Sequence, residues 1–361
     1  MYFRIFSAWR LFAAILVMIY HFTHYGPEGY KEILERLERL MPLLDMFFMV
    51  SGILIFVHYR DRVSSPQAYT GYIVRRFVRI YPLHLITLAF FVAIALTGKI
   101  GLLHIPAVAR YDLSQIPANL LLLQGWGVSK ELSLNYVSWS LSAEWFCYLL
   151  LPVIVYAFRT SGTPGLIVLL SGYFVLMEAM TYFGIMPFSS WMMADTWGAW
   201  RAFADFIAGA LIASAAMESR LTLKSHWPAW IMMAVAITTM QMKVPPYLSY
   251  FLVAVALYIA AVCERNAPER ARWLDVFAPA ASVSFGIYMW HPVIETVTYQ
   301  ALWPRLFQPL GLNFYMFMLV PIAMTILTAW ISYNFFEKWA GKRLARALGA
   351  GSIKNAVAPA E

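Results

Sequence analysis

Two ionisable residues lie in the first apolar segment of the chain, which reads WRLFAAILVMIYHF from Trp9 to Phe22. Arg10 and His21 would be about 17 Å apart along a helix. Ionisable side chains inside a membrane helix are costly and usually serve a function. His21 can exchange a proton near neutral pH, and His24 follows it on the same helical face. The structural alternative is that Arg10 anchors the helix end and His21 is a packed, hydrogen-bonded residue.

Two carboxylates start or interrupt other apolar segments. DMFFMVSGILIF begins with Asp45, which we expect at the outer end of its helix, level with His21 and His24. There Asp45 could orient an imidazole or balance its charge; an acidic helix N-terminus is the alternative. SWSLSAEWFCYLLLP contains Glu144, which shares a helical face with Ser140 and needs a partner inside an apolar helix. The candidate partners of Glu144 are His21, Arg10 and Arg201.

Three arginines occur together in YIVRRFVRIYP. Arg76 and Arg79 are three residues apart and therefore share a helical face, with Arg75 adjacent. Guanidinium groups bind phosphates through paired hydrogen bonds. Because three such charges repel one another unless an anion lies between them, we predict a polyanion site at the inner mouth of the helix. The alternative is that they only anchor the helix on the inner side of the membrane.

A further histidine lies in SVSFGIYMWHPV, where His291 precedes the helix-kinking Pro292. Ser284 and Tyr288 have the spacing to line the same groove as His291. Two more candidates for the lining are Trp139 and Arg201. Together these segments predict a helical bundle in which an anionic donor enters at the inner arginines and a hydroxyl acceptor waits on the outer side.

The composition is that of a polytopic membrane protein. Of 361 residues, 61% are hydrophobic and 13% are charged, whereas soluble proteins carry about 25% charged residues. The net charge of +8 comes from basic residues gathered in short loops, which indicates membrane orientation rather than nucleic-acid binding. Cys147 and Cys263 are far apart in apolar runs, so we predict neither a disulfide nor a metal site.

The apolar runs predict an all-α bundle of about ten spanning helices, because about 20 residues cross a bilayer. The predicted spans are 7–25, 41–58, 77–97, 138–158, 164–184, 200–217, 227–243, 247–263, 277–300 and 313–337. The run 113–126 is short and contains Pro117, so we predict a re-entrant or interfacial segment. With the N-terminus inside, most of the 27 basic residues fall on the inner side. Both termini are then cytoplasmic.

Two polar segments complete this organisation. KEILERLERL, residues 31–40, has one apolar helical face, which fits a helix on the outer membrane surface or a charged helix in a loop. Residues 1–345 are predicted to form a single transmembrane domain. Residues 346–361 are small and polar and are predicted to be a disordered cytoplasmic tail.

Five motifs in this order resemble those of the integral-membrane acyltransferase 3 family, over about residues 4 to 337. Arg10 and His21 match its basic residue, ten-residue gap and histidine. DMFFMVSGILI matches its Asp-x-Phe-Phe-x-x-Ser-Gly block, and RRFVRIYP matches its Arg-x-x-Arg motif on Arg76 and Arg79. WSLSAEWFCYLLLP and SFGIYMWHP match its Trp-Ser-Leu-x-x-Glu and Ser-x-x-x-Tyr-x-x-His blocks. That family O-acylates bacterial surface glycans and small molecules.

The resemblance implies a bacterial inner-membrane enzyme that uses acetyl-CoA from the cytoplasm and needs no metal. It implies that Arg76 and Arg79, with Arg10, lie near the phosphates of the donor, and that His21 is the catalytic histidine. The expected partners are a carbohydrate or glycolipid acceptor and membrane lipids, but no nucleic acid; the oligomeric state is not predicted. His84 departs from the family pattern, and no fused outer domain is expected.

The main hypothesis is direct acyl transfer, in which His21 takes the proton from an acceptor hydroxyl. Glu144 or Asp45 would orient the imidazole, as a carboxylate does in a Ser-His-Asp arrangement. Acetylation of His21 itself, followed by transfer to the acceptor, is the other chemistry. The alternative function is a proton-coupled transporter or flippase for a glycan or lipid-linked precursor, with His21, Glu144 and His291 as a proton relay.

Overall fold

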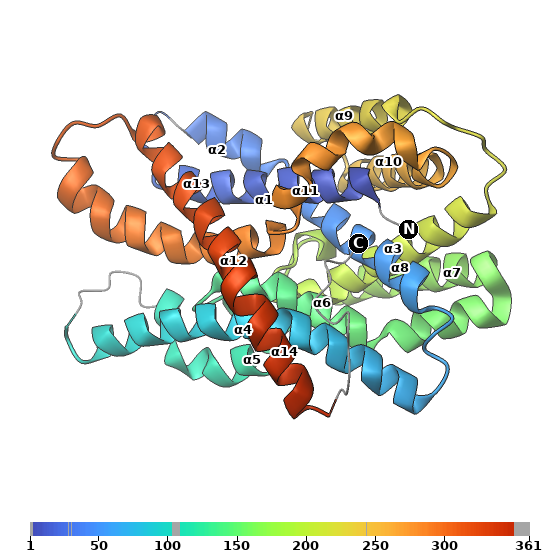
Figure 1. The fold of residues 1–361 in the computed structure, drawn as a ribbon, viewed down its shortest axis with the longest axis horizontal. Helices are drawn as coiled ribbons and strands as arrows, with labels where there is room; N and C mark the ends of the chain where they lie inside the picture. Colours follow the sequence, from blue (N-terminus) through green and yellow to red (C-terminus); the bar gives the residue numbers. More distant parts are fainter. Residues whose placement is uncertain (1–2, 28, 30, 103–108, 243, 350–361) are drawn as a thin grey trace.

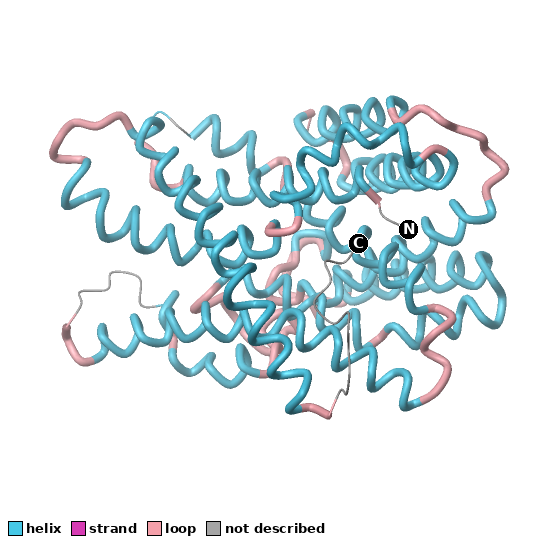
Figure 2. Tube along the Cα trace, in the orientation of Figure 1, coloured by secondary structure: helices cyan, strands magenta, loops and turns pink. Residues whose placement is uncertain are grey.

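The computed structural model describes residues 3–27, 29, 31–102, 109–242 and 244–349. All the secondary structure in these ranges is helical (Figure 2). Most of the predicted tail 346–361, namely residues 350–361, lies outside the described residues. The all-helical class that the apolar runs predicted is therefore confirmed for the described part of the chain.

Figure 1 shows the helices in chain order. The α-helices are α1 (Arg4–Thr23), α2 (Lys31–Glu38), α3 (Leu43–Tyr59), α4 (Pro66–Lys99), α5 (Ile116–Leu120), α6 (Trp139–Leu149), α7 (Leu151–Tyr182), α8 (Gly198–Glu218), α9 (Trp227–Gln241), α10 (Pro246–Asn266), α11 (Ala278–Ala281), α12 (Ser284–Glu295), α13 (Phe314–Ile331) and α14 (Lys338–Ala347). Short 3-10 turns include η2 (Ala109–Tyr111) and η4 (Tyr136–Ser138), and η7 (Thr296–Phe307) and η8 (Ser332–Glu337) are π-helical continuations.

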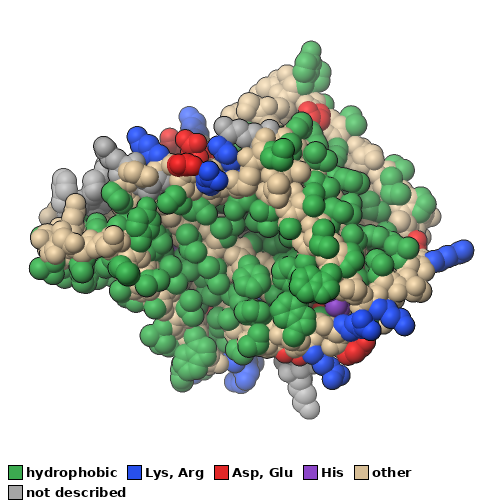
Figure 3. Space-filling model, turned by 90° about the horizontal axis from the view of Figure 1, so that it is seen from above, with side chains coloured by type: hydrophobic (Ala, Val, Ile, Leu, Met, Phe, Trp, Pro, Cys, Tyr) green, Lys and Arg blue, Asp and Glu red, His purple; other side chains and the backbone are tan. Residues whose placement is uncertain are grey.

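Seven helical segments of the described chain are long and apolar enough to cross a membrane. They are Arg4–Thr23, Lys31–Tyr59, Pro66–Lys99, Leu151–Tyr182, Gly198–Glu218, Pro246–Asn266 and Phe314–Ala347. Figure 3 agrees with a membrane protein: hydrophobic side chains cover the middle of this face, and charged side chains gather toward its edges.

The predicted count of about ten spans is not confirmed, because several predicted spans fall on short or bent helices. α6, α9 and α12 have 11, 15 and 12 residues, fewer than the roughly 20 needed to cross a bilayer alone. α7 joins parts of two predicted spans across a bend at Gly162, where φ is +63°. The run 113–126 contains only the five-residue helix α5 and a 3-10 turn, too short to span.

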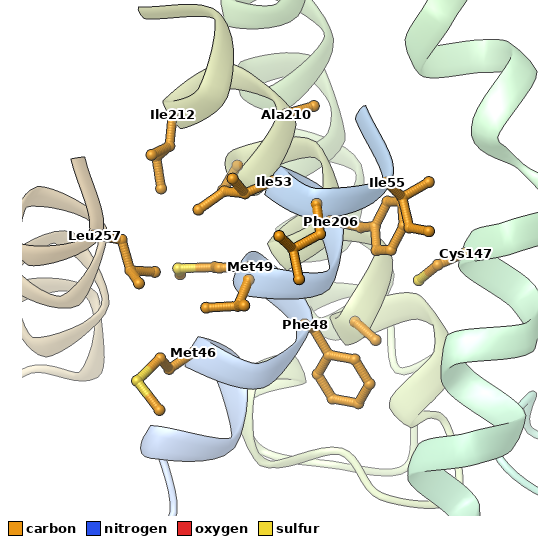
Figure 4. Close-up of a cluster of buried hydrophobic side chains, with 14 of the residues drawn as sticks. Met46, Phe48, Met49, Ile53, Ile55, Cys147, Phe206, Ala210, Ile212 and Leu257 are labelled. Carbon is orange, nitrogen blue, oxygen red and sulfur yellow. The ribbon is translucent and has the colours of Figure 1, made fainter. Parts of the chain in front are cut away.

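The centre of the bundle is the contact between α3 and α8, where the two backbones approach closely. A Cβ atom at Gly52 would overlap the carbonyl of Phe206, and one at Gly209 would overlap the carbonyl of Met49. Small residues allow such approach between membrane helices, where packing and not hydrophobicity drives association. Around the crossing lie buried apolar side chains that include Ile53 (Figure 4). This contact fixes the start of α3, where Asp45 lies, relative to α8.

The close approach at Gly209 predicts a stability difference between two equal substitutions. Gly209→Ala puts a methyl group against backbone of α3, which no rotamer change can relieve, so we expect a loss of roughly 1–3 kcal/mol of stability. Gly172→Ala is the matched control, because nothing lies within 4 Å of its Cβ position on α7. Thermal unfolding in detergent, followed by size-exclusion chromatography, compares the two. An equal melting temperature for both variants would contradict the close packing of α3 and α8.

Candidate active site

Two adjoining cavities lie in the interior of the bundle. One, of about 30 Å³, is lined by Arg10, Arg76, Arg79 and Glu144, among others. The second, of about 60 Å³, shares Arg10 and Glu144 with the first and continues to Tyr288. Its wall also includes Ser51, Ser140 and Ser284. The structure thus brings together, from five different helices, most of the residues that the motifs singled out for the donor side.

The arginines present unsatisfied donors to this space. Arg76 donates from Nη2 to the hydroxyl of Tyr59 at 3.0 Å, and its guanidinium lies over the Tyr59 and Tyr148 rings. The Nε atoms of Arg10 and Arg76 are buried and have no hydrogen-bond partner among the described residues. A buried N–H without a partner costs about 1–3 kcal/mol, more when the group is charged. These donors therefore fit an anion with several acceptor oxygens, such as a phosphate.

Glu144 lies with the arginines and not with His21, which corrects the expectation that it orients the imidazole. Its Oε1 accepts from Ser51 at 3.0 Å and from Tyr148 at 2.6 Å. No contact with His21 is found among the described residues. The reason is position along α1: Glu144 shares its cavities with Arg10, and His21 lies about 17 Å further along the same helix. Of its three candidate partners, Glu144 shares both cavities with Arg10.

Asp45 lies in the first turn of α3, as predicted, but its partner is Arg201 and not a histidine. It forms a buried ion pair with Arg201, with 2.6 Å between Oδ1 and Nη2 and 2.7 Å to Nε. Asp205, one turn after Arg201 on α8, is fully buried and interacts electrostatically with Asp45. Asp45 and Arg201 lie near the starts of the packed helices α3 and α8. The two opposite charges pair because neither can reach water there. Arg201 is thereby a buried partner of Asp45, and neither residue lines the two cavities described above.

His21 lies in a slot made mainly of aromatic rings. Its ring stacks on His291 at 5.2 Å with 21° between the planes, and meets Tyr136 edge-on at 4.9 Å. His21 remains partly accessible, whereas His291 is fully buried with both ring nitrogens unpartnered among the described residues. His24 is exposed, with Nδ1 3.0 Å from the carbonyl of Tyr20. The two histidines that the motifs place on different helices, His21 and His291, are therefore in contact.

Tyr288 connects the inner cavity with this slot. It lines the 60 Å³ cavity, and its ring lies 5.8 Å from that of His291, one turn along α12. Its hydroxyl donates to the carbonyl of Val137 at 3.1 Å, and Ser140 donates to the same carbonyl at 3.0 Å. A continuous series of polar residues thus leads from the arginines to His21.

Two other predicted residues turn out to be packing elements. Trp139 is buried and packs against Phe48 and the backbone of Gly198, and it lines neither cavity. It therefore lies apart from the lining for which the sequence made it a candidate. His84, whose role the sequence left open, is buried in α4 with Nε2 2.8 Å from the carbonyl of Asn119. That contact holds the short helix α5 against α4.

The sequence analysis missed a carboxylate that is linked to His21 through Tyr136. Glu295, at the end of α12, is buried and accepts from Tyr25 and Tyr136, each at 2.7 Å, and from Arg110 at 2.8 Å. Burial and the charge of Glu295 raise the pKa of Tyr136 well above its ordinary value, so its hydroxyl keeps the proton that it donates. The available signal was spacing, since Glu295 follows His291 by one helical turn. Arg110 lies in the short 3-10 turn η2 and carried no such signal.

A large hollow of about 1,260 Å³ opens next to Arg110, the ion-pair partner of Glu295. The end of α4 and parts of residues 109–133 line it, including Lys99, Asp112, Lys130 and Glu131. Tyr111 also lines it, and the Tyr111 hydroxyl donates to Gln300, whose amide donates in turn to Tyr25 at Glu295. Among the described residues, no group of His, Cys, Asp and Glu side chains could hold a metal ion.

The comparisons with known proteins give one family. The model of an acyltransferase domain family matches residues 4–336. A curated relative, acyltransferase MdmB of Streptomyces mycarofaciens, is 31% identical over 150 residues, which are 40% of this chain and 37% of that protein. The matched part is thus little more than a third of the length of the relative. No solved structure matches the chain significantly.

The buried pair of Asp45 and Arg201 predicts a large effect on stability. Arg201→Met leaves the buried carboxyl groups of Asp45 and Asp205 without their cation, so we expect a loss of about 3–5 kcal/mol. Adding Asp45→Asn should recover part of that loss, because it removes one uncompensated charge. The control is Arg36→Met, which breaks an exposed pair with Glu32 and should change stability by less than about 1 kcal/mol. Equal thermal midpoints for the two single variants would show that the buried pair does not stabilise the fold.

Proposed function

The chain belongs to the acyltransferase family whose domain model covers residues 4–336, and from this we propose that it is a membrane O-acyltransferase that uses acetyl-CoA. In this proposal the acetyl group passes from cytosolic acetyl-CoA to a hydroxyl of a glycan or glycolipid at the outer side of a bacterial inner membrane. The observation that carries the proposal is the pair of adjoining cavities that leads from three arginines toward His291 and His21.

The donor would bind at the arginines. Arg10, Arg76 and Arg79 surround one cavity, and the unpartnered Nε atoms of the first two would donate to phosphate oxygens of the CoA moiety. Glu144 would stay bonded to Ser51 and Tyr148 and keep the guanidinium groups facing the cavity. The cavities, of about 60 and 30 Å³, have room for only a few water molecules, so entry of the pantetheine arm requires the side chains between them to move.

The chemistry would take place at His21. The neutral imidazole takes the proton of the acceptor hydroxyl while the hydroxyl oxygen attacks the thioester carbonyl carbon. The carbon–sulfur bond then breaks, and the CoA thiolate leaves and takes up a proton. A positioned general base contributes roughly 10²–10⁴-fold to such a reaction. His291, stacked on His21, would limit the rotation of the imidazole and keep it aimed at the path from the donor.

The acceptor would enter from the hollow beside Tyr111. Its wall carries two lysines and two acidic residues, a balanced set that favours a neutral hydroxyl-rich molecule over a polyanion. The basic helix α14, with Lys338, Lys342 and Arg343, packs across α4 near the arginines of the donor side (Figure 1). That distribution supports cytoplasmic termini, with the donor side inside and the hollow outside.

The proposal predicts a separation between binding and turnover. Purified protein should bind acetyl-CoA and release CoA slowly to water. His21→Ala should bind the donor with unchanged affinity but lose turnover by at least roughly 100-fold, because the general base is gone. The Arg76→Ala/Arg79→Ala variant should bind weakly, because it lacks two cations at the phosphates. Isothermal titration calorimetry and a thiol-reactive dye measure the two quantities.

The matched control is the Arg270→Ala/Arg272→Ala variant, which removes two exposed arginines outside the cavities and should behave like the wild type. If this control loses acetyl-CoA binding as strongly as the Arg76/Arg79 variant, the effect is one of overall charge. If the wild type neither binds acetyl-CoA nor releases CoA, the proposed activity is wrong and transport of a glycan precursor becomes the better account.

A further inference from the structure

Glu295 joins four separate parts of the chain next to His21. Its Oε1 accepts from Tyr25, just beyond α1, and from Arg110 of η2, and its Oε2 accepts from Tyr136 of η4. Arg110 also donates from Nη2 to Thr296 at 3.3 Å. The carboxylate is therefore bonded by three donors that come from three different segments, while it lies itself at the end of α12.

Tyr136 transmits this arrangement to His21. Its hydroxyl is held by Glu295, the Arg110 guanidinium lies over its ring at 4.9 Å, and the ring meets His21 at 66°. A side chain held at both its hydroxyl and its ring face has little rotational freedom. Tyr136 is thus a rigid wall on one side of the His21 imidazole.

A second wall of the His21 slot comes from the same helix as Glu295. His291 lies one turn before Glu295 on α12 and stacks on His21. Both walls of the His21 slot are accordingly placed relative to one carboxylate: His291 through the backbone of α12, and Tyr136 through a hydrogen bond. Loss of the carboxylate would leave the first wall in place and free the second.

The charge on Glu295 is neutralised by the charge of Arg110 inside the protein. The ion pair with Arg110 has side chains that are 15% exposed for Arg110 and 3% for Glu295, so the two charges neutralise each other away from bulk water. Truncating one partner of such a pair leaves the other charge buried without compensation. Glu295→Gln keeps the shape of the side chain but removes its charge and one of its two acceptor oxygens.

We propose that Glu295 is the positioning residue for His21, holding Tyr136 and Arg110 so that the imidazole stays in its slot. This assignment rests on the proposed acyltransferase function. It gives Glu295 the orienting role that the sequence suggested for Glu144 or Asp45. Glu295 acts through Tyr136 and does not itself touch His21.

The test compares Glu295→Gln, Tyr136→Phe and their combination in the full-length protein, with acetyl-CoA hydrolysis as the assay. We expect kcat of Glu295→Gln to fall by roughly 100-fold, the effect of displacing a reacting group by about 1 Å. KM for acetyl-CoA should remain near that of the wild type, whereas the thermal midpoint should fall, because Arg110 is left buried without its counter-charge. The double variant should be little slower than Glu295→Gln alone, because both substitutions act on the same contact between Glu295 and Tyr136.

The matched control is Glu178→Gln, which neutralises a carboxylate that accepts from Trp191 and Tyr247 far along the chain from His21 and should leave kcat unchanged. A Glu295→Gln variant with wild-type kcat, or one whose KM for acetyl-CoA changes together with kcat, overturns the positioning role while the acyltransferase proposal stands. Additive effects of the two single substitutions overturn it as well. A wild type without any CoA release overturns both proposals.

Discussion

The constraint on which this structure depends is the cost of holding ionisable groups inside an apolar helical bundle. Each such charge must meet an opposite charge or a set of hydrogen bonds, because water cannot solvate it there. Asp45 meets Arg201 at the start of α3 and α8, and Glu295 meets Arg110 at the end of α12. Where donors remain without partners, as at Arg10 and Arg76, the same cost indicates a place built for a ligand.

These satisfied and unsatisfied groups divide the bundle into two ends. Three arginines and Glu144 surround the cavities at one end, and Glu295 with its three donors lies beside the hollow at the other. His21 lies between them, against His291. The close crossing of α3 and α8 at two glycines keeps the Asp45 pair in register and holds α3, whose Ser51 lines both cavities. In the proposed function, donor and acceptor approach one histidine from opposite sides of the membrane.

Motif spacing predicted the helical class and the grouping of Arg76 with Arg79, because these depend on helical periodicity and composition alone. It did not predict which carboxylate lies near His21. Asp45 was chosen for its expected depth, and Glu144 because a carboxylate inside an apolar helix needs a partner. The partner that each one meets depends on how α3, α6 and α8 pack. Arg110 and Glu295 approach each other across 185 residues of chain, a contact that one sequence cannot specify. The predicted number of spans also differed from the seven candidates in the structure. Short helices such as α9 lie in apolar runs that are long enough in the sequence to predict a full span.

The central claim is that the acyl group crosses from the arginine side to the opposite side at His21. Proteoliposomes tightly sealed to CoA test it most directly, with acetyl-labelled acetyl-CoA added only outside, where it reaches only molecules whose arginine side faces outward. The account predicts that free CoA accumulates outside while labelled acetate, or an acetylated acceptor enclosed in the vesicles, appears inside. Release of both products on the outside would contradict it, because donor and acceptor would then share one face of the membrane.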